Sequence, residues 1–259
     1  FLDEGDIEIF QQYTTDDNWR EVIQLACGMA RTKEANNIIE LIIKQGDDRK
    51  EQRTELYLLA ASCFENTVKA NNKTKKQVLK RLKQLVPPSN LGMAKELAKH
   101  GDLVVPFLKY KKSYNLKQIQ PIIRALSLIG TESAISTLEV YTTDKRKNVK
   151  KYILDNVKYT SNPARFLKNI SLEYTKIYID RNMPFEVLKN LPKLDTIDFS
   201  KEIEIPYDKI PYSEKVTTIV IGKKTIRDIS FLNKIPNLTN LSLSLSHVKN
   251  LSFLFNKTK

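Results

Sequence analysis

The sequence contains few of the residues on which common catalytic and metal sites depend. Its seven glycines form no glycine-rich loop after a strand, and no G-x-x-x-x-G-K-[ST] phosphate-binding motif occurs. The two histidines, His100 and His247, have no cysteine or histidine at metal-ligand spacing. No G-x-S-x-G nucleophile motif is present either. We therefore predict that the chain itself is not an enzyme, and we assign it no cofactor, metal or catalytic residue.

Cysteines and long hydrophobic runs are equally scarce. Cys27 and Cys63 both lie in apolar helical patterns, which predicts buried thiols in a reducing compartment and argues against a disulfide or a metal site. No uninterrupted apolar run approaches the roughly 18 residues that a membrane span needs, and no signal peptide is recognisable. We expect a soluble, cytoplasmic protein that has no contact with a membrane.

What the sequence does contain is a repeat in its last third. Four segments read apolar-x-x-apolar-x-apolar, and they begin at Tyr174, Leu194, Val216 and Leu238. These starts are 20, 22 and 22 residues apart, and residues 226–232 recur with similar character as residues 248–254. A fixed period of this size is typical of stacked units, each of which buries its apolar side against the next. The pattern resembles a leucine-rich repeat, which implies a short solenoid over residues 171–259.

The preceding part of the chain shows helical periodicity instead. The sequence predicts a helix with Trp19, Val22, Ile23, Ala26, Met29 and Ala30 on one face, a second helix that stops at Gly46, and a later one capped by Ser89 or Asn90. A helix that ends at Gly130 is followed by one with Ala134, Ile135 and Leu138 directed inward. This last pair resembles a HEAT repeat. The expected fold is an α+β solenoid, with a HEAT-like helical domain at 1–170 followed by a leucine-rich-repeat domain at 171–259.

The polar positions of the four repeat segments form the first candidate site. Side chains alternate across a strand, so these positions point away from the apolar core and would pave one face of the sheet. As candidate ligand-binding residues we name Lys176, Tyr178, Asp180, Asp195, Thr196, Asp198, Thr217, Thr218, Thr239, Asn240 and Ser242. Asp195, Asp198, Tyr178 and Lys176 bring charge or an aromatic ring to this face. A face rich in threonine and serine is also what an ordinary soluble strand presents.

A second candidate site follows from the net charge of +13. Two groups make up the basic patch: Lys73, Lys75, Lys76, Lys80, Arg81 and Lys83 in one, and Lys145, Arg146, Lys147, Lys150 and Lys151 in the other. If they lined one side of a solenoid, they would bind phosphates without reading base sequence. Two alternatives are a solvated surface and a contact with the acidic residues between 3 and 17 of the same chain. Nucleic acid is therefore a candidate partner.

The beginning of the chain resembles a segment of NACHT-type STAND NTPases. Residues 19–28 read W-x-E-V-I-x-L-x-x-G and follow the acidic residues Asp16 and Asp17. In that family such a helix, within residues 1–45 here, follows the NTPase and winged-helix core. The resemblance implies the ligand-sensing and autoinhibitory carboxy-terminal region of a bacterial innate-immune NTPase that defends against phage. It also implies two partners: a protein ligand, such as a phage protein, on the repeat face, and an NTPase core upstream in the same polypeptide.

The ends of the chain favour the same interpretation. The sequence begins at Phe1 without an initiator methionine, and the next repeat strand would begin at about residue 260, just past Lys259. We therefore expect a fragment of a longer protein. Two other interpretations are a nucleic-acid-binding α-solenoid and a leucine-rich-repeat scaffold for protein interactions without an NTPase. The sequence does not identify the ligand, the effector or the oligomeric state.

Overall fold

The structure is a computed structural model. It describes residues 8–156, 159–160, 176–179, 188, 191, 193–199, 214–222 and 229–244. The chain divides into two compact units, Phe1–Tyr141 and Thr142–Lys259, and each is described by itself. The domain boundary expected between residues 170 and 171 lies outside the described residues.

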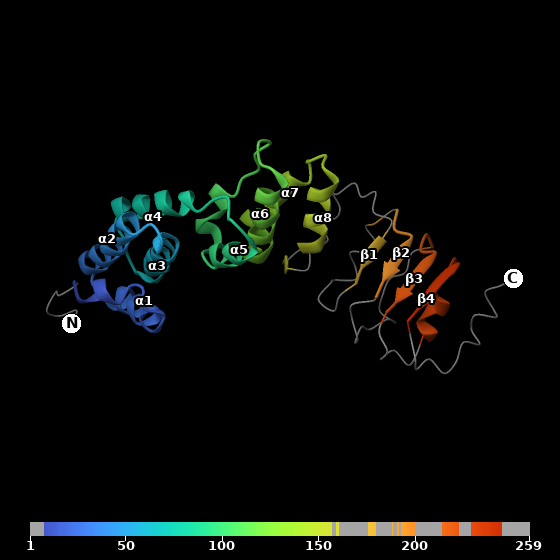
Figure 1. Cartoon of the computed structure of the whole chain (residues 1–259), viewed down its shortest axis with the longest axis horizontal. Helices are drawn as coiled ribbons and strands as arrows, with labels where there is room; N and C mark the ends of the chain where they lie inside the picture. Colours follow the sequence, from blue (N-terminus) through green and yellow to red (C-terminus); the bar gives the residue numbers. More distant parts are fainter. Residues whose placement is uncertain are drawn as a thin grey trace. The chain divides into compact units, whose positions relative to one another are not determined.

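The first unit is built from helices (Figure 1). Its α-helices are α1 (Arg20–Met29), α2 (Thr32–Asp48), α3 (Arg53–Asn66), α4 (Asn72–Gln84), α5 (Leu91–Ala98), α6 (Leu116–Ile129) and α7 (Glu132–Tyr141). Short 3₁₀ helices lie at η1 (Glu8–Gln12), η2 (Asp17–Trp19), η3 (Gly101–Leu103) and η4 (Val105–Phe107). Apolar residues at helical spacing supply the core, among them Ile38, Ile42, Leu56 and Leu59, which are all at most 1% exposed.

Asparagine and glycine set several helix ends, as their chemistry predicts. The side chain of Asn90 accepts a hydrogen bond from the backbone N–H of Met93 at 2.9 Å and so caps α5. Gly130 ends α6 with φ of 65°, a left-handed conformation that glycine adopts without strain. The residues of α7 expected to face inward, Ala134, Ile135 and Leu138, are buried. The cap at Asn90, the stop at Gly130 and the inward face of α7 are thus confirmed.

Two expectations about the first helices are wrong. Gly46 does not stop α2, which continues to Asp48, because Gly46 lies inside the helix where the ring of Tyr57 packs against it. In α1 the buried side chains are Ile23 and Cys27, whereas Val22 and Met29 are 46% and 83% exposed. Apolar residues occur on several sides of α1, so the periodicity alone did not identify the side that packs against α3.

The second unit contains α8 (Lys147–Asn156) and a four-stranded parallel sheet (Figure 1). The strands follow one another in space in their chain order: β1 (Lys176–Tyr178), β2 (Thr196–Asp198), β3 (Thr218–Ile221) and β4 (Asn240–Leu243). Each strand lies in one of the four apolar-x-x-apolar-x-apolar segments. The described residues therefore form helices followed by a small parallel sheet, which agrees with an α+β fold.

The register of the sheet places equivalent residues of the four segments side by side. Lys176 pairs with Thr196, Thr196 with Thr218, and Thr218 with Asn240. The apolar row Ile177, Ile197 and Ile219 is at most 2% exposed, so one face of the sheet forms the core of this unit. The 3₁₀ helix η8 (Ser230–Lys234) contributes Phe231, whose ring meets that of Phe199 edge to face with centroids 6.1 Å apart.

Candidate functional site

The outward face of the sheet carries two rows of side chains that run across the strands. The first row is Lys176, Thr196, Thr218 and Asn240, and the second is Tyr178, Asp198, Val220 and Ser242. Lys176, Tyr178, Asn240 and Ser242 are exposed, and Thr196 and Thr218 are half-buried. Of the other residues expected here, Thr239 is exposed, and Asp195 and Thr217 are half-buried. Asp180 lies outside the described residues.

Asp198 is the exception, because it is only 3% exposed although it shares the outward row. Its carboxylate forms an ion pair with Lys176 of the neighbouring strand, with Nζ and Oδ2 2.8 Å apart. The hydrogen bond to Asp198 raises the pKa of Lys176. The expectation that Asp198 lies exposed on this face is therefore wrong, since the residue is held by a partner within the chain.

Lys176 also contacts the exposed aromatic ring of Tyr178 on this face. Its ammonium lies 4.9 Å from the centroid of the Tyr178 ring, within the range of a cation–π contact. Tyr178 itself is 49% exposed. The ion pair and the cation–π contact fix Lys176 at one edge of the described sheet. The flat ring of Tyr178 is thereby offered to solvent beside a positive charge, an arrangement typical of protein contact sites.

The first basic group lies on α4 and is divided by its contacts. Arg81 binds Asp47 of α2, with Nη2 and Oδ2 2.5 Å apart, and Lys73 forms an ion pair with Glu40 at 3.2 Å. The remaining members, Lys75, Lys76, Lys80 and Lys83, are exposed and form no ion pair with the described residues. Two of the six bases thus neutralise acids of α2, while four carry uncompensated charge.

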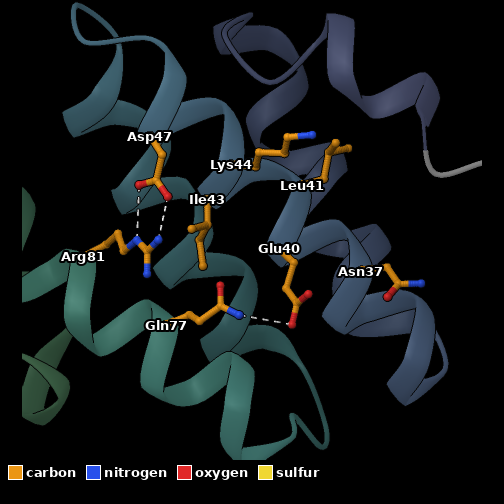
Figure 2. A pocket seen from close by; sticks show the side chains of 8 residues that line it. All are labelled: Asn37, Glu40, Leu41, Ile43, Lys44, Asp47, Gln77 and Arg81. Atoms are coloured by element: carbon orange, nitrogen blue, oxygen red, sulfur yellow. Dashed lines mark hydrogen bonds and ion pairs between the residues drawn. The ribbon is translucent and has the colours of Figure 1, made fainter.

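A groove lies between α2 and α4, and Glu40, Asp47 and Arg81, which take part in these contacts, line it (Figure 2). Its volume is about 440 Å³. Glu40 accepts hydrogen bonds from Thr74 and Gln77 at 3.3 and 3.4 Å, besides its ion pair with Lys73. Motif reasoning missed Glu40, which acts here only through residues more than 30 positions away in the sequence.

A second cluster crosses the same groove and extends to α3. Asp47 accepts hydrogen bonds from Arg81 of α4 and, at 2.6 Å, from the hydroxyl of Tyr57 of α3. The hydrogen bond from Arg81 is the main cause that lowers the pKa of Asp47 below its ordinary value. Burial, together with the hydrogen bond to Asp47, raises the pKa of Tyr57. These contacts connect α2, α3 and α4 and so orient α4 within the unit. Sequence reasoning missed this cluster too, since no local pattern pairs Asp47 with Arg81.

The second basic group lies in the other unit, near α8. Arg146 binds the buried carboxylate of Asp144, with Nη2 and Oδ2 2.5 Å apart, so its charge is compensated inside the chain. Lys145, Lys147 and Lys151 are exposed, and Lys150 is half-buried. Because the two basic groups belong to separate units, a continuous stripe through both remains a prediction.

The cysteines and His100 are buried in the first unit. Cys27 and Cys63 are free and buried, as expected, and a hydrogen bond with Cys27 together with burial raises the pKa of the Cys63 thiol. His100 is buried and places Nδ1 2.7 Å from the carboxylate of Glu65. Among the described residues no group of three or more His, Cys, Asp or Glu side chains is arranged to hold a metal.

Two further observations concern the membrane and the relatives of the chain. Within the part of the chain that the structure describes, every helix is too short or too polar to cross a membrane. Comparison of the chain with protein-family models, with curated proteins and with solved structures gave no match.

Proposed function

We propose that the outward face of β1–β4 recognises a protein ligand. The observation that carries this proposal is the parallel, in-register pairing of strands whose paired residues lie 20, 22 and 22 positions apart. Such pairing places one polar side chain of each strand beside its equivalent in the next, so the strands offer one continuous surface. Tyr178 supplies the exposed aromatic ring of the kind that contributes most at protein interfaces.

We propose further that these strands belong to a leucine-rich-repeat solenoid. Backbone hydrogen bonds recur with the same period: the carbonyl of Asp195 accepts from the N–H groups of Thr217 and Thr218, and that of Thr217 accepts from those of Thr239 and Asn240. Turns before β2 and β4 also match. The N–H of Leu191 donates to Leu188 and that of Ile235 to Leu232, and these two turns are 44 residues apart. In the helical unit, the α6–Gly130–α7 pair supports a HEAT-like arrangement.

On this basis the chain would be the sensing and autoinhibitory carboxy-terminal region of a bacterial NACHT-type STAND NTPase that acts in defence against phage. The Trp19 segment supports this proposal, because Trp19 ends η2 and α1 begins directly after it, with the ring of Tyr13 stacked on Trp19 at 4.0 Å. A ligand switches such a protein only if it binds the open state more tightly than the closed one. A shift from 1:99 to 99:1 in favour of the open state requires a difference of about 10⁴-fold in affinity.

The first part of the test is the coding sequence upstream of Phe1. We expect it to encode a Walker A motif, G-x-x-x-x-G-K-[ST], ahead of a winged-helix segment. Its absence over several hundred upstream codons would contradict the NTPase proposal. That result would not test the recognition face, which needs a separate experiment. Mutagenesis of the sheet face supplies this second part of the test.

For the second part, the complete protein carries Tyr178→Ser together with Asn240→Ala. Both side chains are exposed on the outward face, so the core row of the sheet is left intact. In cells challenged with a phage that the unaltered protein resists, we expect plating efficiency to rise to that of unprotected cells, with ATP binding unchanged. Glu214→Gln, an exposed position outside the strands, is the matched control and should preserve protection. Full protection by the double variant would refute the proposed recognition face.

A further inference from the structure

The side of α4 that faces away from the core carries a row of lysines. Thr74, Val78 and Leu82 are at most 1% exposed, and their i, i+4, i+8 spacing defines the side of α4 that packs on the core. At 100° per residue, Lys76, Lys80 and Lys83 lie on the opposite side. We call these three residues the lysine stripe. The orientation follows from burial, since a helix with one buried side must present the other to solvent.

The lysine stripe differs from Lys73 and Arg81 of the same helix, which form ion pairs with acids of α2. Gln77 and Arg81 point toward α2, where they meet Glu40 and Asp47 (Figure 2). Lys76, Lys80 and Lys83 are exposed and form no ion pair with any described residue. α4 contains no acidic residue at all, so no i+3 or i+4 partner is available within the helix either.

This spacing brings like charges together. Lys76 and Lys80 are four residues apart, and Lys80 and Lys83 are three apart, the separations at which helical side chains are neighbours. Like charges at these separations destabilise a helix, so a row of anions placed along the stripe would relieve the repulsion. Lys76 and Lys80, with Lys73 and Arg81, also line a shallow hollow of about 440 Å³.

We propose that the lysine stripe binds the phosphodiester backbone of duplex nucleic acid without reading its sequence. Lys76 and Lys83 are seven positions apart, which is about 10 Å along the helix axis at 1.5 Å per residue. One strand of duplex DNA presents a phosphate about every 3.4 Å of helix axis, so this length matches about three phosphates. The three lysines thus match three phosphates. This site is distinct from the sheet face, and its ligand is a nucleic acid where that of the sheet face is a protein.

Other anionic partners fit this surface less well. Insertion into a lipid surface needs several apolar or aromatic side chains on the exposed side, but of the three apolar residues of α4, Val78 and Leu82 are buried and only Leu79 is half-buried. Stacking on unpaired bases needs aromatic rings, and α4 contains none. An acidic protein would be expected to offer apolar contacts beside its charges, for which the stripe has no counterpart.

The test measures fluorescence anisotropy of a labelled 20-base-pair DNA duplex of mixed sequence with the full chain. Neutralising three phosphates predicts a slope of log K against log salt of about −2.7, hence a loss of about 40-fold in affinity between 50 and 200 mM salt. Lys76→Gln with Lys80→Gln leaves one lysine, so the slope should fall to about −0.9, with affinity at 50 mM salt at least tenfold lower. Lys76→Arg with Lys80→Arg, which keeps the charge, should retain binding.

Lys95→Gln with Lys112→Gln is the matched control, because both lysines are exposed in the first unit outside α4 and the change in net charge is the same. It should bind like the unaltered chain. An RNA duplex of equal length separates recognition of the backbone charge, which both duplexes share, from recognition of DNA geometry, and either preference is compatible with the site. The proposal is overturned by equal losses in the stripe and control variants. No duplex binding at 50 mM salt, or binding only to polyglutamate or to phosphatidylserine vesicles, would also overturn it.

Discussion

Replacing Gly46 by alanine tests whether the packing of α2 against α3 is as close as the structure indicates. A Cβ atom at Gly46 would lie 2.7 and 2.8 Å from two ring carbons of Tyr57 and 3.2 Å from Cβ of Leu56. Carbon atoms pack at about 3.5–4.0 Å, so the ring must move by about 1 Å. Tyr57 is 2% exposed and its hydroxyl is bound to Asp47 at 2.6 Å, which leaves the ring little room.

The expected magnitude follows from two opposing effects. Overpacking of this kind costs about 1–3 kcal/mol, and weakening the bond between Tyr57 and Asp47 adds about 1 kcal/mol. Alanine is favoured over glycine inside a helix by about 1 kcal/mol, which partly offsets these costs. We therefore expect Gly46→Ala to lower the free energy of unfolding of the first unit by about 1–3 kcal/mol.

The control is the same substitution in a Tyr57→Val background, where both ring carbons that the new Cβ would meet are absent. There Gly46→Ala should raise stability by up to about 1 kcal/mol, because the helix preference remains and the only close contact left is with Cβ of Leu56 at 3.2 Å. The assay is urea unfolding followed by the fluorescence of Trp19, the only tryptophan of the chain, which lies in the first unit. An equal effect of Gly46→Ala in both backgrounds, or no loss of stability in the unaltered chain, would refute the reasoning.

Two further predictions concern buried or bridging hydroxyl and carboxyl groups. Because Arg81 lowers the pKa of Asp47 in the folded state, this carboxylate stabilises the fold above its unfolded pKa of about 4 and loses that effect as pH falls through the lower folded value. Asp47→Asn should flatten this acid part of the stability profile and cost about 0.5–1 kcal/mol at pH 7; urea titrations at stepped pH that show parallel profiles would contradict it. Tyr141→Phe removes the hydroxyl that donates to the carbonyl of Leu108 at 2.8 Å in the core, and should cost about 1–2 kcal/mol, seen as a lower thermal midpoint. An unchanged midpoint would show that the carbonyl finds another donor.

The helices and strands of this chain could be predicted where the deciding signal is local. Asn90 caps α5 through a backbone group three residues away, and Gly130 ends α6 through its own backbone conformation. The strand segments were found from their spacing, and the sheet pairs their equivalent residues in register. These features depend on residues that lie close together in the sequence or recur at a fixed period.

The features that could not be predicted depend on partners far along the chain. Gly46 suggested a helix stop, but its role is set by Tyr57 of the next helix. Asp198 has the outward position of a solvent-exposed residue, yet Lys176 of the preceding strand binds it and it lies buried. Likewise, the six bases predicted around α4 look equivalent in the sequence. The acids at Glu40 and Asp47, more than 30 residues upstream, decide which of them keep their charge uncompensated.

This division of the bases makes the proposals about α4 separable by experiment. The buried side of α4 sets its orientation, and the contacts of Tyr57 and Arg81 with Asp47 support the same orientation without involving the lysine stripe. Gly46→Ala disturbs the cluster without changing any charge, and the Lys76→Gln, Lys80→Gln pair changes charge without touching the cluster. If the stripe binds nucleic acid as proposed, the lysine pair should lose affinity without losing stability, because it also removes a repulsion between like charges. Gly46→Ala should instead lose stability and keep the salt slope of its folded fraction. The lysines of the stripe are exposed, on the side of α4 opposite its buried residues, so their replacement removes no contact with the core. If the lysine pair nevertheless lost stability, the stripe would have a role in the fold.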